Sequence, residues 1–329
     1  MAPGGTIGQV EALLAARRFA EAARLLLGSA EAGETAAVVE LARWRIAGNL
    51  VRRDLTEARR LLGLAAAKGE DGAASLHARF LAGGVGGPDD WPAALAALRS
   101  LAKRRAEAAA QLRLIEAMEL GPDGFPTRPI GTEVLSEAPR VAAASSFMTE
   151  AECRYLTGAG EPELQPSAVV DPATGRMVPH PVRSSDAAMF GVYGEDLVIN
   201  ALNRRIAALS GTRLDQGEPL QLLRYRPGGE YKPHMDALPA EPNQRILTVL
   251  VYLSDDYEGG ETGFPNTGLS FRGRTGDALL FRNAGADGRA DPLSLHAGLP
   301  VTRGTKYLAS RWIRAARFTY PPPKPLLNL

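Results

Sequence analysis

The stretch YKPHMDALPA, residues 231–240, places a histidine and a carboxylate two positions apart, directly after a glycine-rich turn at 227–229. Side chains at positions i and i+2 of a strand point to the same face, so His234 and Asp236 should project together. An imidazole and a carboxylate on one face form either a surface ion pair or two ligands of a metal site. These two residues alone leave both interpretations open.

A third ligand is available in LSLHAGLPVTRGTKY, where His296 is the only histidine further along the strand-rich part of the chain. Two imidazoles and one carboxylate on one face of a metal are typical of non-haem iron(II) oxygenases, and they leave three coordination positions open. Lys306 follows ten positions later, an even separation, but the turn PVTRG intervenes and the spacing does not decide its direction. The other two histidines, His77 and His180, are interpreted as structural.

Length and composition narrow the class of protein. A chain of 329 residues favours two domains. The net charge of +1, with both signs interspersed, argues against nucleic acid or an anionic membrane as the main partner. No apolar stretch reaches the roughly 20 residues that span a bilayer, and no signal peptide is visible. Cys153 is the only cysteine, so we expect a cytoplasmic protein whose metal ligands are His, Asp or Glu.

The first 120 residues predict a helical repeat. Equivalent residues recur every 36 positions: Phe19, Leu55 and Trp91; Ala22, Ala58 and Ala94; Leu26, Leu62 and Leu98. Gly48 and Gly84 mark turns, and Asp54 and Asp90 are expected to cap the next helix. A period of this length predicts an α-solenoid of helical hairpins that resembles tetratricopeptide repeats. Such a solenoid either docks a peptide or protein partner or serves only as a scaffold.

The residue pattern is no longer that of the helical repeat after the Gly- and Pro-rich segment 121–131. Thr149 and Glu152 form a capping-box pattern that should open a helix, and residues 194–211 predict a second helix that ends at Gly211. From residue 220 onward, short β-rich runs alternate with turn residues; they are 220–225, 246–253, 278–281 and 306–313. We therefore predict a two-domain α+β protein. Residues 1–120 form the solenoid, 121–140 a linker, and 141–329 a jelly roll with flanking helices.

Residues 141–317 resemble the prolyl 4-hydroxylase branch of the 2-oxoglutarate and iron(II)-dependent dioxygenases. Four pieces match in the order that the family has them: LQLLRYRPGGEYKPHMD, RILTVLVYLSDDYEGGETGFP, GDALLF and LHAGLPVTRGTKYLASRWI. The upstream SFMTEAEC and RSSD are also similar to that family. The resemblance covers the second domain, implies a double-stranded β-helix (jelly roll), and leaves the helical repeats outside.

The resemblance implies roles for particular residues. It implies iron ligation by His234, Asp236 and His296, and contacts to 2-oxoglutarate by Lys306 and Tyr225. A buried ammonium is costly unless an anion neutralises it, which agrees with the role of Lys306. Thr248 is expected to add a hydroxyl to the cosubstrate site. Trp312, Arg245 and Arg183 match positions that face the substrate.

The implied reaction consumes 2-oxoglutarate and O2 at Fe(II), with ascorbate as a reductant, and couples the release of succinate to hydroxylation of a C–H bond. The implied substrate is a prolyl residue in a peptide or protein, which the repeats could dock. Two alternatives stay open: a hydroxylase of a free amino acid or other small molecule, and a repeat adaptor whose oxygenase domain is inactive. Asp236 favours hydroxylation, because related halogenating enzymes lack the carboxylate ligand.

Two proline-rich segments raise further hypotheses. Residues 171–186, DPATGRMVPHPVRSSD, are aperiodic and are interpreted as a lid over the pocket. The C-terminal YPPPKPLLNL is typical of a polyproline II segment. It either stays disordered or occupies a substrate site of its own or a neighbouring chain.

Overall fold

The computed structural model describes residues 5–170, 177–179, 182–285, 287–319 and 323–327. It divides into two compact units. The first contains Met1–Gly124, Glu195–Asn200 and Thr319–Leu329, and the second contains Phe125–Gly194 and Ala201–Phe318. In the part of the chain described, no helix combines the length and the apolar character that crossing a bilayer would require.

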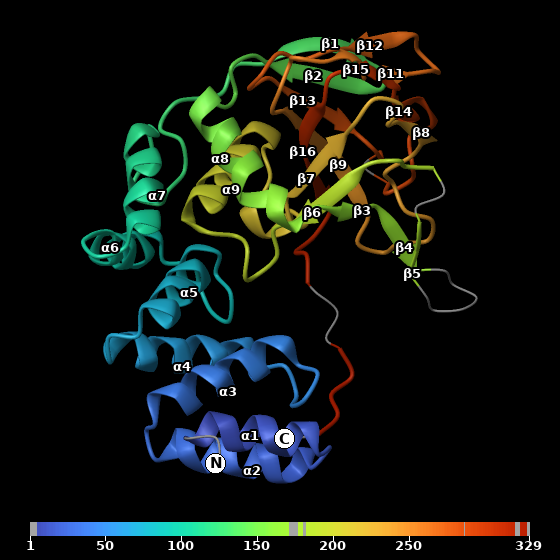
Figure 1. The fold of residues 1–329 in the computed structure, drawn as a ribbon. Coiled ribbons are helices and arrows are strands. Elements are labelled where there is room, and N and C mark those ends of the chain that lie inside the picture. Colours follow the sequence, from blue (N-terminus) through green and yellow to red (C-terminus); the bar gives the residue numbers. More distant parts are fainter. Residues whose placement is uncertain (1–4, 171–176, 180–181, 286, 320–322, 328–329) are drawn as a thin grey trace. The chain divides into compact units, whose positions relative to one another are not determined.

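The first unit is built from helices that pack in sequence order (Figure 1). They are α1 (Thr6–Ala15), α2 (Phe19–Glu31), α3 (Thr35–Ala47), α4 (Leu55–Ala67), α5 (Asp71–Ala82), α6 (Trp91–Ala102) and α7 (Ala106–Ala117). Phe19, Leu55 and Trp91 are the first residues of α2, α4 and α6. The period of 36 residues therefore corresponds to one pair of helices, and the predicted helical-hairpin repeat is confirmed.

The turns between these helices follow the predicted chemistry. Asp54 accepts a hydrogen bond from the backbone N–H of Glu57 at 2.9 Å, and Asp90 accepts one from Ala93 at 3.0 Å. Each carboxylate satisfies one of the backbone donors that a helix start leaves unpaired. Gly48 ends α3 with φ of 73°, a left-handed conformation that glycine adopts without steric cost.

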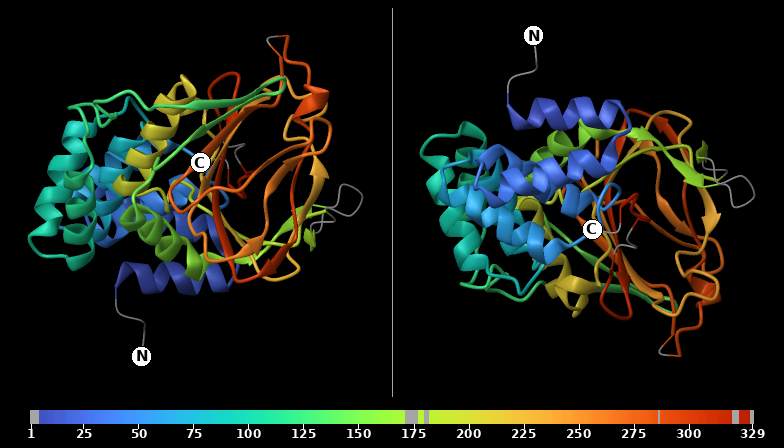
Figure 2. Two further views of the ribbon diagram at one scale, coloured as in Figure 1. Left: turned by 90° about the horizontal axis from the view of Figure 1, so that it is seen from above. Right: turned by 90° about the horizontal axis from the view of Figure 1, so that it is seen from below.

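The second unit contains two main antiparallel sheets, the jelly roll that the sequence predicts (Figure 2). The large sheet runs, in spatial order, β1 (Glu133–Glu137), β2 (Arg140–Ala144), β13 (Ala278–Arg282), β9 (Arg245–Tyr252), β16 (Lys306–Arg314), β7 (Gln221–Tyr225), β6 (Asp186–Met189) and β3 (Gln165–Pro166). The small sheet runs β12 (Leu269–Phe271), β11 (Thr262–Phe264), β14 (His296–Gly298) and β8 (Tyr231–His234). Two further pairs join β10 (Glu258–Gly259) to β15 (Val301–Arg303) and β4 (Ala168–Val170) to β5 (Met177–Pro179).

Helices cover the outer face of the large sheet. Helix α8 (Glu150–Gly160) opens with the predicted capping box, in which Thr149 and Glu152 exchange hydrogen bonds with each other's backbone. It packs closely on β7, since a Cβ atom at Gly160 would lie 2.7 Å from a methyl group of Leu222. Helix α9 (Leu197–Ser210) ends before Gly211, as predicted. Short 3-10 turns are η1 (Glu161–Glu163), η2 (Leu214–Gln216) and η3 (Pro292–Ser294).

Strand β16 shows how the sheet separates its two faces. Lys306, Leu308, Ser310 and Trp312, at alternate positions, line an internal cavity. Between them, Arg311 is buried on the opposite face, where it donates to the carbonyl of Asn203 in α9 at 3.1 Å. This is the two-residue alternation of a strand with both faces covered. The even spacing from Lys306 to Trp312 therefore places both side chains in the cavity.

The unit boundaries differ from the predicted domains. The predicted linker 121–140 contains β1, a strand of the large sheet, because its residues 133–137 pair with β2. Residues Thr319–Leu329, which we assigned to the second domain, group with the helical repeats. The predicted lid, 171–186, lies partly outside the described residues, and its remaining parts form β5 and the start of β6.

Candidate metal centre and cosubstrate site

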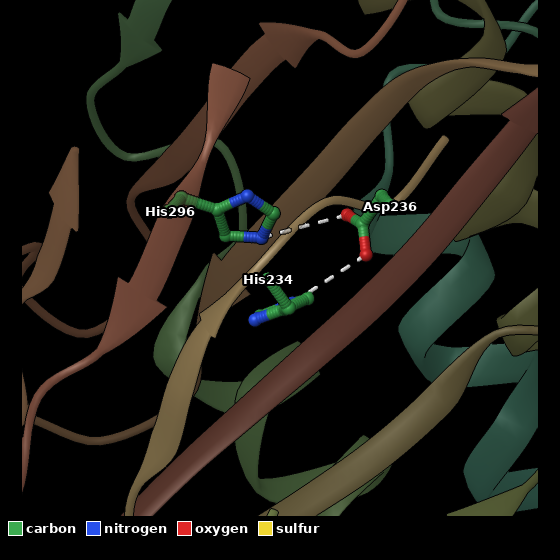
Figure 3. A group of neighbouring side chains, drawn as sticks. All are labelled: His234, Asp236 and His296. Atoms are coloured by element: carbon green, nitrogen blue, oxygen red, sulfur yellow. Dashed lines mark ion pairs between the residues drawn. The ribbon is translucent and has the colours of Figure 1, made fainter. Parts of the chain in front are cut away.

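The small sheet brings the three predicted metal ligands together. His234 at the end of β8 and His296 at the start of β14 are directly paired across the antiparallel ladder. Asp236 lies two residues beyond the end of β8, and the ligand atoms of all three residues lie within 4.8 Å of one another. Figure 3 shows the side chains pointing toward one point. The predicted convergence of these three residues is confirmed.

Backbone carbonyls fix both imidazole rings in the same way. His234 Nδ1 lies 2.9 Å from the carbonyl oxygen of Lys232, and His296 Nδ1 lies 3.0 Å from that of Ser294. A carbonyl only accepts, so each Nδ1 carries the proton and donates it. The Nε2 atoms then keep their lone pairs free, and each lies 3.6 Å from a carboxylate oxygen of Asp236. This is the arrangement in which histidine binds a metal.

A buried chain of hydrogen bonds holds the carboxylate. Thr248 Oγ1 donates to Asp236 Oδ2 at 2.5 Å, and Asn283 Nδ2 donates to Thr248 Oγ1 at 2.8 Å. All three side chains are buried. Because a carboxylate can only accept, the Thr248 hydroxyl proton is committed to Asp236, and Asn283 supplies the donor that completes the hydroxyl. Thr248 is bonded to the metal ligand and is absent from the cavity lining, which differs from its predicted contact with the cosubstrate.

The electrostatics of the cluster agree with metal binding. Burial acts to raise the pKa of Asp236, but His296, His234 and the Thr248 hydroxyl together hold that pKa well below its ordinary value. Burial lowers the pKa of His296, with Asp236 acting in the opposite direction. The cluster therefore offers the anionic carboxylate of Asp236 and the neutral imidazole of His296 at neutral pH. This donor set suits a divalent iron ion.

Lys306 is a buried cation without a carboxylate partner. Its side chain is 2% exposed, and its Nζ donates to the carbonyl of Gly260 at 2.7 Å. Nζ also lies 5.6 Å and 5.2 Å from the ring centres of Tyr225 and Tyr252. Among the described residues no carboxylate pairs with it, and burial lowers its pKa to about 7, with Glu261 acting weakly in the opposite direction. An anion in the cavity would remove this cost.

Other predicted residues also line the cavity. Tyr225 on β7 is paired directly with Lys306 on β16 across the ladder, and burial raises the pKa of its hydroxyl to about 12, so it stays protonated. Arg183 and Trp312 belong to the same lining. Arg183 Nε and Trp312 Nε1 are buried and have no hydrogen-bond partner within the described residues. Two donors are therefore available to a molecule in the cavity.

Arg245 occupies a different place from the predicted one. It is absent from the lining, and its guanidinium forms two hydrogen bonds with the carboxylate of Glu218, at 2.6 Å and 2.9 Å. The same guanidinium lies 3.6 Å from the ring centre of Trp312. Arg245 therefore packs against the Trp312 ring, and the carboxylate of Glu218 neutralises its charge.

Sequence reasoning missed two residues of the site, Tyr231 and Asn283. The Tyr231 ring stacks on His234, with ring centres 3.4 Å apart and planes inclined by 12°, and it lines the cavity. The Arg183 guanidinium lies 5.3 Å from the Tyr231 ring centre. An aromatic residue three positions before a suspected ligand was a usable signal for Tyr231. No signal in the sequence indicated Asn283, because its burial depends on how β13 and β9 pair.

The comparisons with known sequences agree with this geometry. Residues 220–314 match the family model of the 2OG-Fe(II) oxygenase superfamily. Prolyl 4-hydroxylase 1 of Arabidopsis thaliana is 40% identical over 202 residues, which cover 55% of this chain and 71% of that protein. Probable prolyl 4-hydroxylase 3 of the same plant is 38% identical and covers 57% and 73%. The viral collagen prolyl hydroxylase of Paramecium bursaria Chlorella virus-1, in its 2OG complex, is 29% identical, with a TM-score of 0.44 and coverage of 54% and 96%.

The chain therefore belongs to the 2OG-Fe(II) oxygenase superfamily. It is an enzyme of that class, similar to plant prolyl 4-hydroxylases, with Fe(II) and 2-oxoglutarate as cofactor and cosubstrate. The residues present fit both groups: His234, Asp236 and His296 form a cluster that could hold the iron, and Lys306 offers a buried cation to the cosubstrate. The helical repeats lie outside the matched region.

Proposed function

We propose that this chain hydroxylates prolyl residues of a peptide or protein, with 2-oxoglutarate as the cosubstrate. One observation carries the proposal. A cluster of metal ligands and an unneutralised buried ammonium line the same cavity. The cluster suits the iron, and the ammonium suits the far carboxylate of 2-oxoglutarate. The similarity to proteins named prolyl 4-hydroxylases supports the prolyl substrate.

The bound iron supplies activation of O2, with 2-oxoglutarate as the source of electrons and succinate and carbon dioxide as its products. The residues of the chain hold these groups in place and exclude water. His234, Asp236 and His296 would hold the iron, and the hydrogen bond from the Thr248 hydroxyl to Oδ2 orients the Asp236 carboxylate. Lys306 holds the far carboxylate of the cosubstrate, and Leu223, Leu250 and Leu308 keep water away from the reacting atoms.

The part of the cavity lined by Arg183, Tyr231 and Trp312 offers groups that suit a prolyl peptide. The ring faces of Tyr231 and Trp312 can pack on a pyrrolidine ring. The unpaired Arg183 Nε and Trp312 Nε1 can donate to peptide carbonyls, which matters because a prolyl residue presents a carbonyl and no N–H. A free amino acid would leave these donors without the carbonyls of neighbouring residues.

The test is turnover by the full-length chain with Fe(II), ascorbate and 2-oxoglutarate against a library of proline-containing peptides. We expect one succinate for each oxygen added to a prolyl residue, detected by mass analysis of the peptide. Turnover of free amino acids alone would favour the small-molecule alternative. An absence of succinate with every substrate would favour the inactive adaptor. Asp236→Ala is the matched inactive control.

We further propose that the helical repeats bring protein substrates to the enzyme. In the described part of residues 5–124, every polar or charged residue is at least partly exposed, so a partner can contact the repeats through such side chains. A docking role predicts that a protein substrate has a lower KM than the isolated peptide of the same sequence, with a similar kcat. Equal KM values would leave the repeats as a scaffold.

A further inference from the structure

Residues 323–327 lie on the helical repeats, within the same compact unit. The backbone N–H of Leu326 donates to the carbonyl of Asn49 at 2.8 Å, and that of Leu327 donates to Leu50 at 2.9 Å. Leu327 and Val51 form a parallel β-bridge. Residues 323–327, the C-terminal segment, therefore lie along the loop that joins α3 and α4, residues 48–54, and are attached to it by one β-bridge and two main-chain hydrogen bonds.

The C-terminal segment contacts the loop with one edge. Pro323, Pro325 and Leu327 are partly buried, whereas Lys324 and Leu326 are exposed. Alternate side chains of the segment therefore face the repeats. A Cβ atom at Gly48 would lie 3.2 Å from Cγ of Pro323, so the absent side chain makes room for the proline ring. The loop thus contacts a Pro-x-Pro-x-Leu pattern.

The loop is held by contacts of its own. Arg53 Nε donates to the carbonyl of Ile46 at 3.0 Å, and the backbone N–H of Asp54 donates to the carbonyl of Arg45 at 2.9 Å. Val51 is 1% exposed and anchors the loop in the core of the repeats. The carbonyls that accept from the C-terminal segment are therefore presented by the repeats themselves. Because the segment bends at Leu326, two successive N–H groups donate to this loop, and another chain that adopts the same bend can make the same two hydrogen bonds.

We propose that the loop 48–54 is a binding site for Pro-x-Pro-x-Leu segments, and that the chain's own C-terminal segment competes there with protein substrates. The proposal rests on the proposed function for the prolyl character of those substrates. Two main-chain hydrogen bonds and three partly buried side chains make a weak contact that can exchange. Attachment to the same chain compensates for this weakness, because a tethered ligand acts at an effective concentration on the order of millimolar.

The test is the binding of a fluorescently labelled peptide with the sequence of residues 319–329, TYPPPKPLLNL, to the full-length chain and to two variants. Leu326→Pro removes the N–H that donates to Asn49, and it alters a side chain that is 62% exposed. Leu326→Ala keeps the N–H and is the matched control. We expect the labelled peptide to bind Leu326→Pro at least about tenfold more tightly than it binds the intact chain, because the tethered competitor is released. Leu326→Ala should behave like the intact chain.

Three results would overturn the proposal. The peptide could bind the intact chain and Leu326→Pro equally, or bind neither. Alternatively, light scattering could show the intact chain as a dimer that Leu326→Pro converts to a monomer, which would assign the segment to a neighbouring chain. The binding assay needs neither iron nor 2-oxoglutarate, so its failure is distinct from a failure of the proposed hydroxylation.

Discussion

The helical repeats up to Gly124 and the second unit bury different kinds of side chain. Among the described residues up to Gly124, the buried side chains are apolar, and alanines such as Ala22, Ala58 and Ala94 let the helices pack closely. The second unit buries Asp236, Thr248, Asn283, His296 and Lys306 around one cavity. Burying a polar group costs free energy unless it finds a partner, and an unneutralised ammonium costs most. The second unit thus accepts a local cost where it binds ligands, whereas the repeats are optimised for packing.

This difference indicates where each unit performs its function. The second unit places its chemistry in the interior, where the low effective dielectric strengthens each electrostatic contact. The repeats keep an apolar interior and present backbone groups at a loop, which suits recognition of another chain. Substitutions of cavity residues should therefore change catalytic activity strongly, and they can raise or lower the stability of the protein. Changes in the repeats should alter stability or binding and leave the chemistry intact.

The largest effect is expected for Asp236→Ala. Loss of the only anionic ligand should remove stoichiometric iron and abolish succinate formation, a greater loss than the roughly 10–100-fold cost of removing an outer partner of a metal ligand. Metal analysis and succinate assays measure both. Asp256→Ala, at an exposed carboxylate of the same unit, should retain iron and activity. Undiminished turnover in Asp236→Ala would show that Asp236 is not an iron ligand.

Lys306→Met should weaken the binding of 2-oxoglutarate and, at the same time, raise the stability of the ligand-free protein. Loss of the cation that faces the cosubstrate carboxylate should raise the Kd for 2-oxoglutarate by roughly 100-fold or more, as for one partner of a buried ion pair. The same change removes a buried ammonium that lacks an anion, so the ligand-free protein should become more stable. Its Tm should rise by roughly 2–4 °C for each kcal/mol recovered. A lower Tm together with unchanged 2-oxoglutarate binding would contradict this role.

Thr248→Val should weaken iron binding by roughly 10–100-fold, because the hydroxyl that fixes Asp236 Oδ2 is lost. Thr248→Ser retains the hydroxyl and should bind iron within a few-fold of the intact chain. Titration with Fe(II), or with Co(II) as an air-stable substitute, measures the affinity without turnover. Equal losses in both variants would indicate packing instead of orientation of the carboxylate.

The pH dependence of cosubstrate binding follows from Lys306. Its pKa in the ligand-free protein is about 7, so the ammonium is fully charged below that pH and discharges as the pH rises. A bound carboxylate raises the pKa, so binding takes up a proton above pH 7, and the Kd for 2-oxoglutarate should rise by up to about tenfold per pH unit there. Lys306→Arg carries a permanent charge and is the control. A Kd that is constant from pH 6 to 9 in the intact chain would count against this assignment.

The smallest effect is expected in the repeats. Asp54→Ala removes the N-cap of α4 and should lower the free energy of unfolding by about 0.5–2 kcal/mol, with kcat on a short peptide unchanged. Thermal unfolding and peptide turnover measure the two quantities. Asp90→Ala removes the equivalent cap of α6 and should behave alike. A fall in kcat in either variant would break the proposed separation between packing and chemistry.

Much of the site could be predicted because it is encoded locally. Lys306 and Trp312 lie at an even spacing on β16, so strand geometry alone places both side chains on one face. His234 and Asp236 are only two residues apart, and this short separation keeps both side chains together although β8 ends at His234. The 36-residue period likewise needed only repetition along the chain. In each case the signal depends on neighbours in sequence.

What escaped prediction depends on residues far apart in sequence. The Thr248 hydroxyl bonds to Asp236 because β9 lies beside the ligand loop, and Asn283 reaches Thr248 because β13 pairs with β9. Arg245 turns to Glu218, which no local pattern indicates. The C-terminal segment lies on a loop more than 270 residues earlier in the chain. Propensity and spacing carry no information about such pairings.

The central claim is that one cavity of the intact chain holds one ferrous ion on His234, Asp236 and His296 and one 2-oxoglutarate beside it. Anaerobic titration with Fe(II) and 2-oxoglutarate, followed by visible absorption, tests it most directly. We predict a charge-transfer band that requires both additions and saturates at one equivalent of each per chain. If iron and 2-oxoglutarate bind without such a band, or if the band persists in Asp236→Ala, the two ligands do not meet at these residues and the account is contradicted.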